Sequence, residues 1–187
     1  MIDSKTLCLM WHLVTSEDPN TKLYDHQIET ACHFSQEVIE SSQKYNIDPF
    51  VVISIIYNES RWTETIKNKE GACGLGQIVY KYNPENKSKK KCNELLIGKI
   101  NIEVITKILN QNLINNNGNY KKALPCYASG PKCSYKIYSN IILSKSKVLK
   151  RYYLKARIKI KFDSLKNTMY KTLDFLKEKV KKCIKFK

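Results

Sequence analysis

The chain has 187 residues and a formal net charge of +16, with 42% hydrophobic residues and only six Gly and five Pro. This length suits one domain with an appendage, and the composition excludes a disordered or collagen-like chain. No apolar run approaches the roughly 20 residues that a membrane-spanning helix needs. We therefore predict a globular protein.

The positive charge is concentrated near the C-terminus. Residues 145–187 contain 16 Lys or Arg against Asp163, Asp174 and Glu178, whereas the first 144 residues contain 17 basic and 14 acidic residues. Such an asymmetry indicates an acidic partner, which could be nucleic acid, a membrane surface or an anionic polymer. Coding bias is a second interpretation of the many lysines, because Asn, Ile and Tyr are also abundant.

Seven cysteines cannot all pair within one chain, and they stand at positions 8, 32, 73, 92, 126, 133 and 183. Cys126 with Cys133 is the best candidate for a disulfide, and Cys73 with Cys92 is the next. The sequence alone settles neither pairing.

Histidine occurs only at positions 12, 26 and 33, and the chain has no C-x-x-C motif. No zinc-ligand spacing results, so we predict neither a metal site nor a cofactor. His26, Cys32 and His33 are better explained by one face of a packed helix.

The first half of the chain reads as helical. The apolar stretch Leu7–Val14 has no small-residue cleavage pattern after it, so we predict no secretory signal there. Apolar residues from Tyr24 to Tyr45 recur near the helical period. Phe50–Tyr57 is a buried helix or a buried strand, and helix is favoured because Asp48 is a good N-cap and Pro49 suits the first helical position.

The second half begins with a polar, loop-like stretch over residues 63–93. Helical spacing resumes over Ile100–Leu113, and Tyr120–Tyr127 carries a short apolar set. Arg157–Phe162 alternates like a strand, which leaves that junction open. Apolar residues at three- and four-residue steps then predict an amphipathic helix with a lysine-covered face, through Phe162, Leu165, Met169, Leu173, Leu176, Val180 and Ile184.

Glu59 is the most informative single position, because it closes the apolar segment. Apolar packing and the negative end of a helix both disfavour a carboxylate, so both should raise the pKa of Glu59. A raised pKa is what a general acid needs near neutral pH.

Four motifs in order carry a resemblance to a known family. They are Glu59-Ser60, then Gly71-Ala72-Cys73-Gly74-Leu75-Gly76-Gln77-Ile78, then Asn101-Ile102 at a helix start, and then Ala123-Leu124-Pro125-Cys126-Tyr127-Ala128-Ser129-Gly130-Pro131. This order resembles the catalytic domain of soluble lytic transglycosylases, of the goose-type lysozyme superfamily. The resemblance covers roughly residues 47–131.

The resemblance implies a mainly α, lysozyme-like helical domain that cleaves peptidoglycan. It assigns Glu59 as the catalytic acid and then base, and it assigns substrate binding to Ser60, Gly74, Leu75, Gln77, Ile78 and Tyr127. We place this domain at residues 23–140, after an N-terminal segment (1–22) and before a basic, amphipathic helical extension (141–187).

The sequence departs from the family pattern at three positions. Gly76 stands where Met is usual, Asn68 where Ser is common, and Ala128 where Asn follows the tyrosine. In the family, the Met usually lines the sugar groove and the Asn usually helps to hold the substrate or the catalytic carboxyl group. These changes put affinity and rate in question more than the reaction class.

Two alternatives to a lytic transglycosylase stay open. A goose-type muramidase, which hydrolyses the bond, would want a second acid after the catalytic helix, but residues 71–83 contain no Asp or Glu. Glu64 and Glu70 are nearer to Glu59 in sequence and are read as solvated loop charges. A non-catalytic wall-binding component of a phage or secretion apparatus is the other alternative.

The expected partner is the glycan strand of peptidoglycan, at the cell wall or in the periplasm. The export route stays open and includes secretion or carriage in a virion. Residues 145–187 are expected to act as an accessory anchor on an anionic wall polymer or a membrane surface. Nucleic acid is an unlikely partner, because aromatic residues among the lysines also suit an apolar helix face and no recognised nucleic-acid motif accompanies them.

Overall fold

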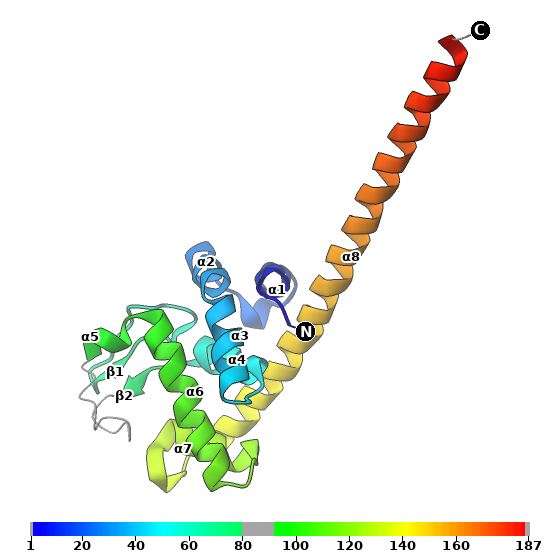
Figure 1. The fold of residues 1–187 in the computed structure, drawn as a ribbon. Helices are drawn as coiled ribbons and strands as arrows, with labels where there is room; N and C mark the ends of the chain where they lie inside the picture. Colours follow the sequence, from blue (N-terminus) through cyan, green and yellow to red (C-terminus); the bar gives the residue numbers. More distant parts are fainter. Residues whose placement is uncertain (1, 80–91, 186–187) are drawn as a thin grey trace.

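The computed structural model describes residues 2–79 and 92–185, with side chains described up to Phe175 and at Lys177. Helices dominate these ranges, as the sequence predicts, and one of them extends far beyond the rest of the molecule (Figure 1). The α-helices are α1 (Ser4–Glu17), α2 (Asp25–His33), α3 (Ser35–Lys44), α4 (Pro49–Ser60), α5 (Cys92–Leu95), α6 (Gly98–Asn115), α7 (Tyr120–Ser129) and α8 (Ile137–Lys185).

Helix α4 is the centre of the domain and confirms the helical reading of the apolar segment. The Asp48 side chain accepts a hydrogen bond from the backbone N–H of Phe50, and Pro49 occupies the first helical position. Every residue from Phe50 to Tyr57 is buried, so the helix is covered on all sides. It ends at Arg61, which has the left-handed conformation with φ 47°.

The helical period over residues 24–45 belongs to two helices, α2 and α3. The chain breaks at Phe34, which ends α2 and begins α3. Its ring is buried against Gly98 at the start of α6, where a β-carbon would collide with the ring. Burial of this aromatic side chain needs a bend that a continuous helical period does not reveal.

The loop-like stretch folds into a short antiparallel hairpin of β1 (Ala72–Cys73) and β2 (Ile78–Val79). Ala72 pairs with Val79, and Cys73 pairs with Ile78. The turn between them therefore contains Gly74, Leu75, Gly76 and Gln77, which is the glycine-rich motif noted in the sequence.

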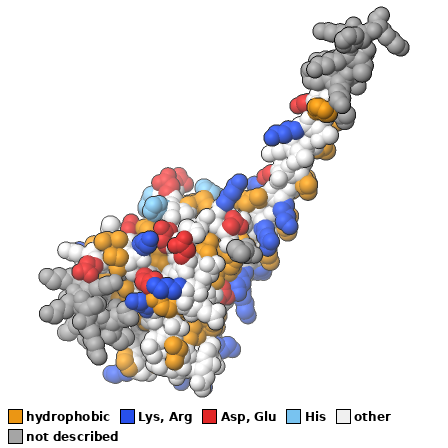
Figure 2. All heavy atoms as spheres, viewed as in Figure 1, with side chains coloured by type: hydrophobic (Ala, Val, Ile, Leu, Met, Phe, Trp, Pro, Cys, Tyr) orange, Lys and Arg blue, Asp and Glu red, His pale blue; other side chains and the backbone are white. Residues whose placement is uncertain are grey.

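Helix α8 has two different halves. Its first half packs against α1, α4 and α7, and its buried side chains continue through Ile142, Leu149 and Tyr153 to Ala156. From Arg157 to Phe175 every side chain but that of Ile160 is exposed, and this half projects away from the domain (Figure 2). The strand-like alternation at residues 157–162 is thus part of a helix, since no neighbouring strand is present there to pair with it among the described residues.

The expected boundary between residues 140 and 141 falls inside α8. Beyond it, one face of the helix packs on the domain core through the buried residues Ser146, Leu149, Tyr153 and Ala156. The N-terminal segment also contributes α1, whose Leu7, Met10, Trp11 and Val14 are buried in the same core. These burials depend on contacts distant in sequence, which local charge and composition do not report.

Three disulfides tie the described part of the chain together. They are Cys73–Cys92 and Cys126–Cys133, the two candidates from sequence, and Cys8–Cys32, which joins α1 to α2. Closing loops of 24, 19 and 7 residues stabilises a fold by about 2–4 kcal/mol each. Cys183 lies beyond the described side chains.

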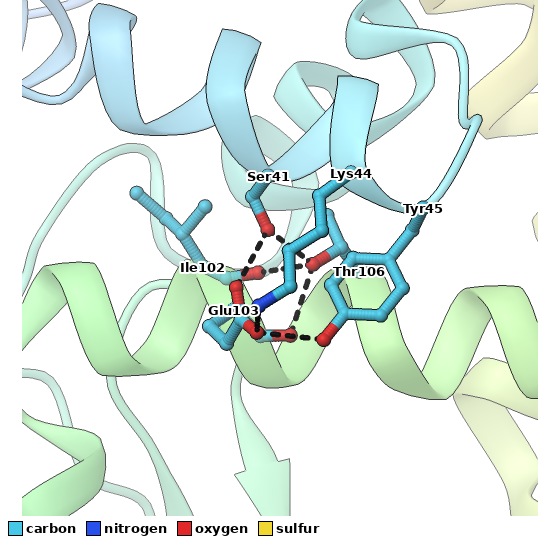
Figure 3. A network of polar contacts seen from close by, with 6 residues as sticks. All are labelled: Ser41, Lys44, Tyr45, Ile102, Glu103 and Thr106. Carbon is cyan, nitrogen blue, oxygen red and sulfur yellow. Dashed lines mark hydrogen bonds and ion pairs between the residues drawn. The ribbon is translucent and has the colours of Figure 1, made fainter.

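A polar network fixes α3 to α6 (Figure 3). The Glu103 carboxylate accepts hydrogen bonds from the Tyr45 hydroxyl at 2.6 Å and from the Lys44 ammonium at 2.8 Å. The buried hydroxyls of Ser41 and Thr106 lie 2.6 Å apart beside this carboxylate. The hydrogen bonds and the nearby ammonium hold the pKa of Glu103 below its ordinary value despite partial burial. Helix α6 is thereby held on the core, and its other face is free to line a groove.

Candidate active site

A groove of about 1120 Å³ opens beside the end of α4. Its walls come from the end of α4, the β1–β2 turn, the C-terminal half of α6, the end of α7 and the start of α8. The described residues that line it are Asn58, Glu59, Gly76, Gln77, Ile78, Val79, Ile108, Gln111, Asn112, Asn115, Asn116, Cys126, Tyr127, Ala128, Ser129, Gly130, Pro131, Lys132, Cys133, Tyr135 and Tyr138.

Glu59 lies in this groove, half-buried in the last turn of α4. Burial removes water from its carboxylate and raises the pKa of Glu59 above the ordinary value. Hydrogen bonds from Tyr138 and Asn58 act in the opposite direction, and burial is the larger effect. The direction agrees with the sequence argument from apolar packing.

Tyr138 is the closest partner of Glu59. Its hydroxyl donates a hydrogen bond to Oε1 of Glu59 at 2.6 Å, and Asn58 Nδ2 donates to the same oxygen at 3.3 Å. Tyr138 is 2% exposed, and burial together with the nearby charge of Glu59 raises its own pKa well above the ordinary value. The phenol therefore stays protonated and serves as a fixed donor to the carboxyl group.

Tyr127 approaches the same place from α7. Its ring stacks on that of Tyr138, with centroids 6.3 Å apart and planes 13° from parallel. Its hydroxyl donates to the backbone carbonyl of Gly76 at 2.9 Å, so it does not bond to Glu59 itself. The tyrosine pair thus connects the β1–β2 turn, α7 and α8 around the acid.

Asn101 holds the glycine-rich turn in place from the first turns of α6. Its buried amide oxygen accepts a hydrogen bond from the N–H of Gly76 at 2.7 Å. Its amide nitrogen donates to the carbonyls of Leu95 at 2.7 Å and Cys73 at 3.0 Å. The three hydrogen bonds of Asn101 give the Asn101-Ile102 motif a physical role, because they hold the β1–β2 turn that forms one wall of the groove.

The absence of a side chain at Gly76 has a structural reason in this chain. A β-carbon there would lie 2.6 Å from Cδ1 of Ile105 and 2.7 Å from the hydroxyl of Tyr127, both closer than real contacts allow. The space beside Gly76 is therefore filled by side chains from α6 and α7. Gly76 belongs to this packing and still lines the groove.

The structure places the residues predicted to bind substrate in two groups. Gln77, Ile78 and Tyr127 line the groove with Glu59. Ser60, Gly74 and Leu75 are buried and do not line it. The Ser60 hydroxyl donates to the carbonyl of Ile56 at 3.1 Å, and a β-carbon on Gly74, which has φ +72°, would collide with Leu95 and Asn101.

Amide side chains supply much of the polar lining. Asn58, Gln111, Asn112, Asn115 and Asn116 accompany Gln77, whose amide nitrogen donates to the backbone carbonyls of Ile66 and Gly74. Amides combine donors and acceptors, which suits the hydroxyl and acetamido groups of a sugar. Sequence reasoning overlooked most of these residues and Tyr138, because single polar positions on α6 and α8 carry no local signal of a shared groove.

Glu59 is the single carboxylate among the described residues that line the groove. Glu64 has a structural role instead. Its Oε1 accepts a hydrogen bond from the N–H of Gly98 at 2.6 Å and so caps α6. The Glu64 side chain is half-buried, whereas we expected a solvated loop charge. The hydrogen bond to the start of α6 holds it against the domain. Glu70 is exposed.

One cluster in the described ranges has three side chains of metal-binding type, Cys8, His12 and Cys32. The disulfide between the two cysteines occupies their sulfur atoms. This cluster therefore offers no thiolate ligands in the oxidised protein, and it lies on α1 and α2, outside the groove.

A half-buried carboxyl group beside an amide-lined groove, in a helical domain, is suited to acid–base chemistry on a polar ligand. Comparison with known families agrees: the transglycosylase SLT domain matches residues 36–141, more than half of the chain. The chain belongs to this family. The match ends in the first turns of α8 and so includes both Glu59 and Tyr138.

Family membership makes peptidoglycan, in the cell wall, the substrate class of this domain. Within the described ranges, no helix is both long enough and apolar enough to cross a membrane.

Proposed function

We propose that the protein is a lytic transglycosylase that breaks the β-1,4 bond between N-acetylmuramic acid and N-acetylglucosamine. The observation that carries the proposal is the carboxyl group of Glu59, the single one among the described residues that line the groove. Burial raises the pKa of Glu59, and Tyr138 holds its side chain by a hydrogen bond. A raised pKa favours the protonated form that a general acid needs.

The first step is proton donation from Glu59 to the glycosidic oxygen. Tyr138 and Asn58 both donate to Oε1, so we assign the proton to Oε2. As the bond to C1 of the muramoyl residue breaks, the proton passes to the leaving oxygen and Glu59 becomes a carboxylate. The Tyr138 hydrogen bond strengthens when its acceptor gains charge, so it stabilises this form of Glu59 more than the protonated form.

The second step needs no water. The Glu59 carboxylate removes the proton from the C6 hydroxyl of the same muramoyl residue, and that oxygen closes onto C1 as a 1,6-anhydro ring. Glu59 regains its proton and is ready for another cycle. One carboxyl group thus performs both steps, unlike the two-carboxylate arrangement of most glycosidases.

The use of Glu64 as a cap supports this reaction over hydrolysis. A hydrolase would need a base to position water opposite the leaving group. Glu64 instead accepts the N–H of Gly98, and residues 71–83 contain no acid. We therefore favour a lyase over a goose-type muramidase.

The location we propose is the cell wall or periplasm, outside the reducing cytosol. Three disulfides among the described residues support it, because structural disulfides persist in oxidising compartments. The glycan strand would lie along the groove. Gln77, Ile78 and Tyr127 would contact the sugar units next to Glu59.

Mass spectrometry of a digested sacculus tests the proposal directly. We expect 1,6-anhydromuropeptides, which are lighter by one water than the products of hydrolysis. Muramic acid with reducing ends would establish a muramidase instead. No products from a folded, wall-binding protein would establish the non-catalytic alternative, and Glu59→Gln serves as the matched inactive control.

A further inference from the structure

The outer half of α8 carries an apolar stripe with no cover from the domain. We define it as Ile158, Phe162, Leu165, Met169 and Leu173, all of which are exposed. Leu165 is 70% exposed and Ile158 is 69% exposed, which is unusual for side chains of this size. Ile158 and Met169, like Phe162 and Leu173, are eleven residues apart, and an 11-residue spacing keeps side chains nearly in line along a helix.

The stripe faces away from the domain. With 3.6 residues per turn, its mean direction is roughly 170° from that of the buried residues Leu149, Tyr153 and Ala156 on the same helix. Figure 2 shows hydrophobic side chains along the edge of the projecting helix that is turned away from the domain. A flat surface could therefore contact the whole stripe without colliding with the domain.

Lysine side chains border the stripe on both sides. Lys159 and Lys166 flank it on one side and Lys161 on the other, each within about 80° of its centre by the same helical geometry. Asp163 and Asp174 lie about 120° and 140° from that centre, on the side toward the domain. All five side chains are exposed. Arg157 and Lys171, which are also exposed, lie about 120° and 160° from the centre. Three of the five cations in residues 157–175 thus border the apolar stripe, and both anions lie away from it.

We propose that residues 157–175 dock on an anionic lipid surface, with the apolar stripe inserted at the headgroup boundary and the flanking lysines on lipid phosphates. A helix with one apolar face, bordered by Lys and Arg, is suited to lie in the plane of such a surface. Each nearby lysine adds attraction to anionic lipid. This interaction goes beyond the proposed reaction and does not depend on Glu59.

Two other occupants fit the stripe less well. A second copy of the helix would bring like-charged lysines together along both edges of the contact, which is unfavourable. A polar anionic wall polymer would satisfy the lysines and leave the stripe in water. Of these three occupants, only an anionic lipid surface offers negatively charged headgroups to the lysines and, just beneath them, an apolar layer to the stripe.

The geometry also gives the docked protein an orientation. Tyr138, beside Glu59, is 20 residues from Ile158 along one continuous helix, which is about 30 Å at 1.5 Å per residue. The groove and the docking segment are therefore connected by a rigid element. The domain would stand on the far side of the helix from the lipid, with the groove near the end of α8 that the lipid does not bind.

The test compares two substitutions of equal charge in the full chain, Leu165→Glu in the stripe and Asn167→Glu on the opposite face. Binding is measured by co-sedimentation with vesicles of phosphatidylcholine plus phosphatidylglycerol, and with pure phosphatidylcholine. We expect the parent to prefer the anionic vesicles. Asn167→Glu should weaken binding by less than about fivefold, and Leu165→Glu by roughly thirtyfold or more.

Control measurements separate a loss of lipid binding from a loss of folding and from binding of the other two occupants. Leu165 lies outside the domain core, so both variants should unfold at the same temperature as the parent. Equal losses for the two variants, or binding to purified walls but not to vesicles, would overturn the proposal. So would a dimer in analytical ultracentrifugation that Leu165→Glu dissociates while vesicle binding persists. Anhydromuropeptide release by either variant from short soluble glycans should match that of the parent.

Discussion

The Tyr138 hydroxyl lies 2.6 Å from Oε1 of Glu59, although the two residues are 79 positions apart in the sequence. This contact brings the first turn of α8 to the last turn of α4. The long helix is therefore part of the candidate active site at one end and a projecting arm at the other. Four predictions address how the domain, the acid and this helix depend on one another.

Glu59→Gln should abolish glycan cleavage and raise the stability of the protein at neutral pH. An amide cannot donate or recover the proton. Burial raises the pKa of Glu59, so the folded state disfavours its ionised form. The parent therefore loses stability as pH rises from the unfolded-state pKa through the raised folded-state pKa, by about 1.4 kcal/mol per unit of difference. Glutamine removes this penalty.

Urea unfolding of the two proteins as a function of pH checks this expectation. The difference in unfolding free energy should be near zero at a pH below both pKa values of Glu59 and should grow toward neutral pH. A difference that is constant with pH would contradict the assignment of a raised pKa. The Glu64→Gln variant is the control for loss of a carboxyl group outside the groove.

Tyr138→Phe should shift the pH dependence of cleavage. The hydroxyl favours the carboxylate of Glu59, so its removal should raise the pKa of Glu59 further. Activity requires protonated Glu59 at the start, so the decline of kcat/KM with rising pH should move to higher pH. Loss of a hydrogen bond to a charged group should also lower kcat by roughly tenfold.

Tyr135→Phe is the matched control for that experiment. Tyr135 also lines the groove and lies beside Tyr138, with ring centroids 6.0 Å apart, but it is exposed. Its substitution should leave the pH profile in place. A Tyr138→Phe profile that coincides with the parent profile would show that the hydroxyl only fills space.

Gly76→Ala should destabilise the protein by about 1–3 kcal/mol, the usual cost of overpacking. The added methyl group would meet Ile105 and the hydroxyl of Tyr127, which has its own hydrogen bond to Gly76. Ile105→Ala should be costly alone, because it leaves a cavity in a fully buried position.

The double variant shows whether the contact between the added methyl group and Ile105 causes the loss of stability. Gly76→Ala with Ile105→Ala should lose less stability than the sum of the two single losses, by about 1 kcal/mol or more. Additive losses, measured by urea unfolding, would show that the methyl group at position 76 is accommodated elsewhere.

Truncation within α8 should separate its two halves. A chain that ends after Tyr138 would lack Ile142, Leu149, Tyr153 and Ala156, so we expect it not to fold. A chain that ends after Arg157 keeps these residues and should unfold within a few degrees of the parent. It should also retain cleavage of short soluble glycans. Circular dichroism melting curves of the two truncated chains make this comparison.

Loss of folding or of activity on short glycans after truncation at Arg157 would mean that the projecting half supports the domain. We expect no such support, because every side chain from Arg157 to Phe175 except that of Ile160 is exposed. The salt dependence of wall and vesicle binding should fall with the same truncation, because exposed charges are screened beyond about 10 Å at 0.1 M salt.

The sequence by itself determined the helical class, the buried α4 and the identity of Glu59 as the central acid. These features are local: Asp48 and Pro49 begin the helix, an unbroken apolar run requires burial, and an acid at its end acquires a raised pKa. The motif order then indicated the family that residues 36–141 match. The reaction of Glu59 remains a proposal.

Only the tertiary structure decided which residues surround that acid and where the domain ends. Tyr138 meets Glu59, Asn101 holds Gly76, and Glu64 caps α6 through contacts between segments distant in sequence. The basic C-terminal region is a second example. Lysines and arginines occur along both halves of α8, although the first half packs on the domain and the second half is exposed. Charge and periodicity repeat along a helix, whereas burial depends on which neighbours the fold places beside it.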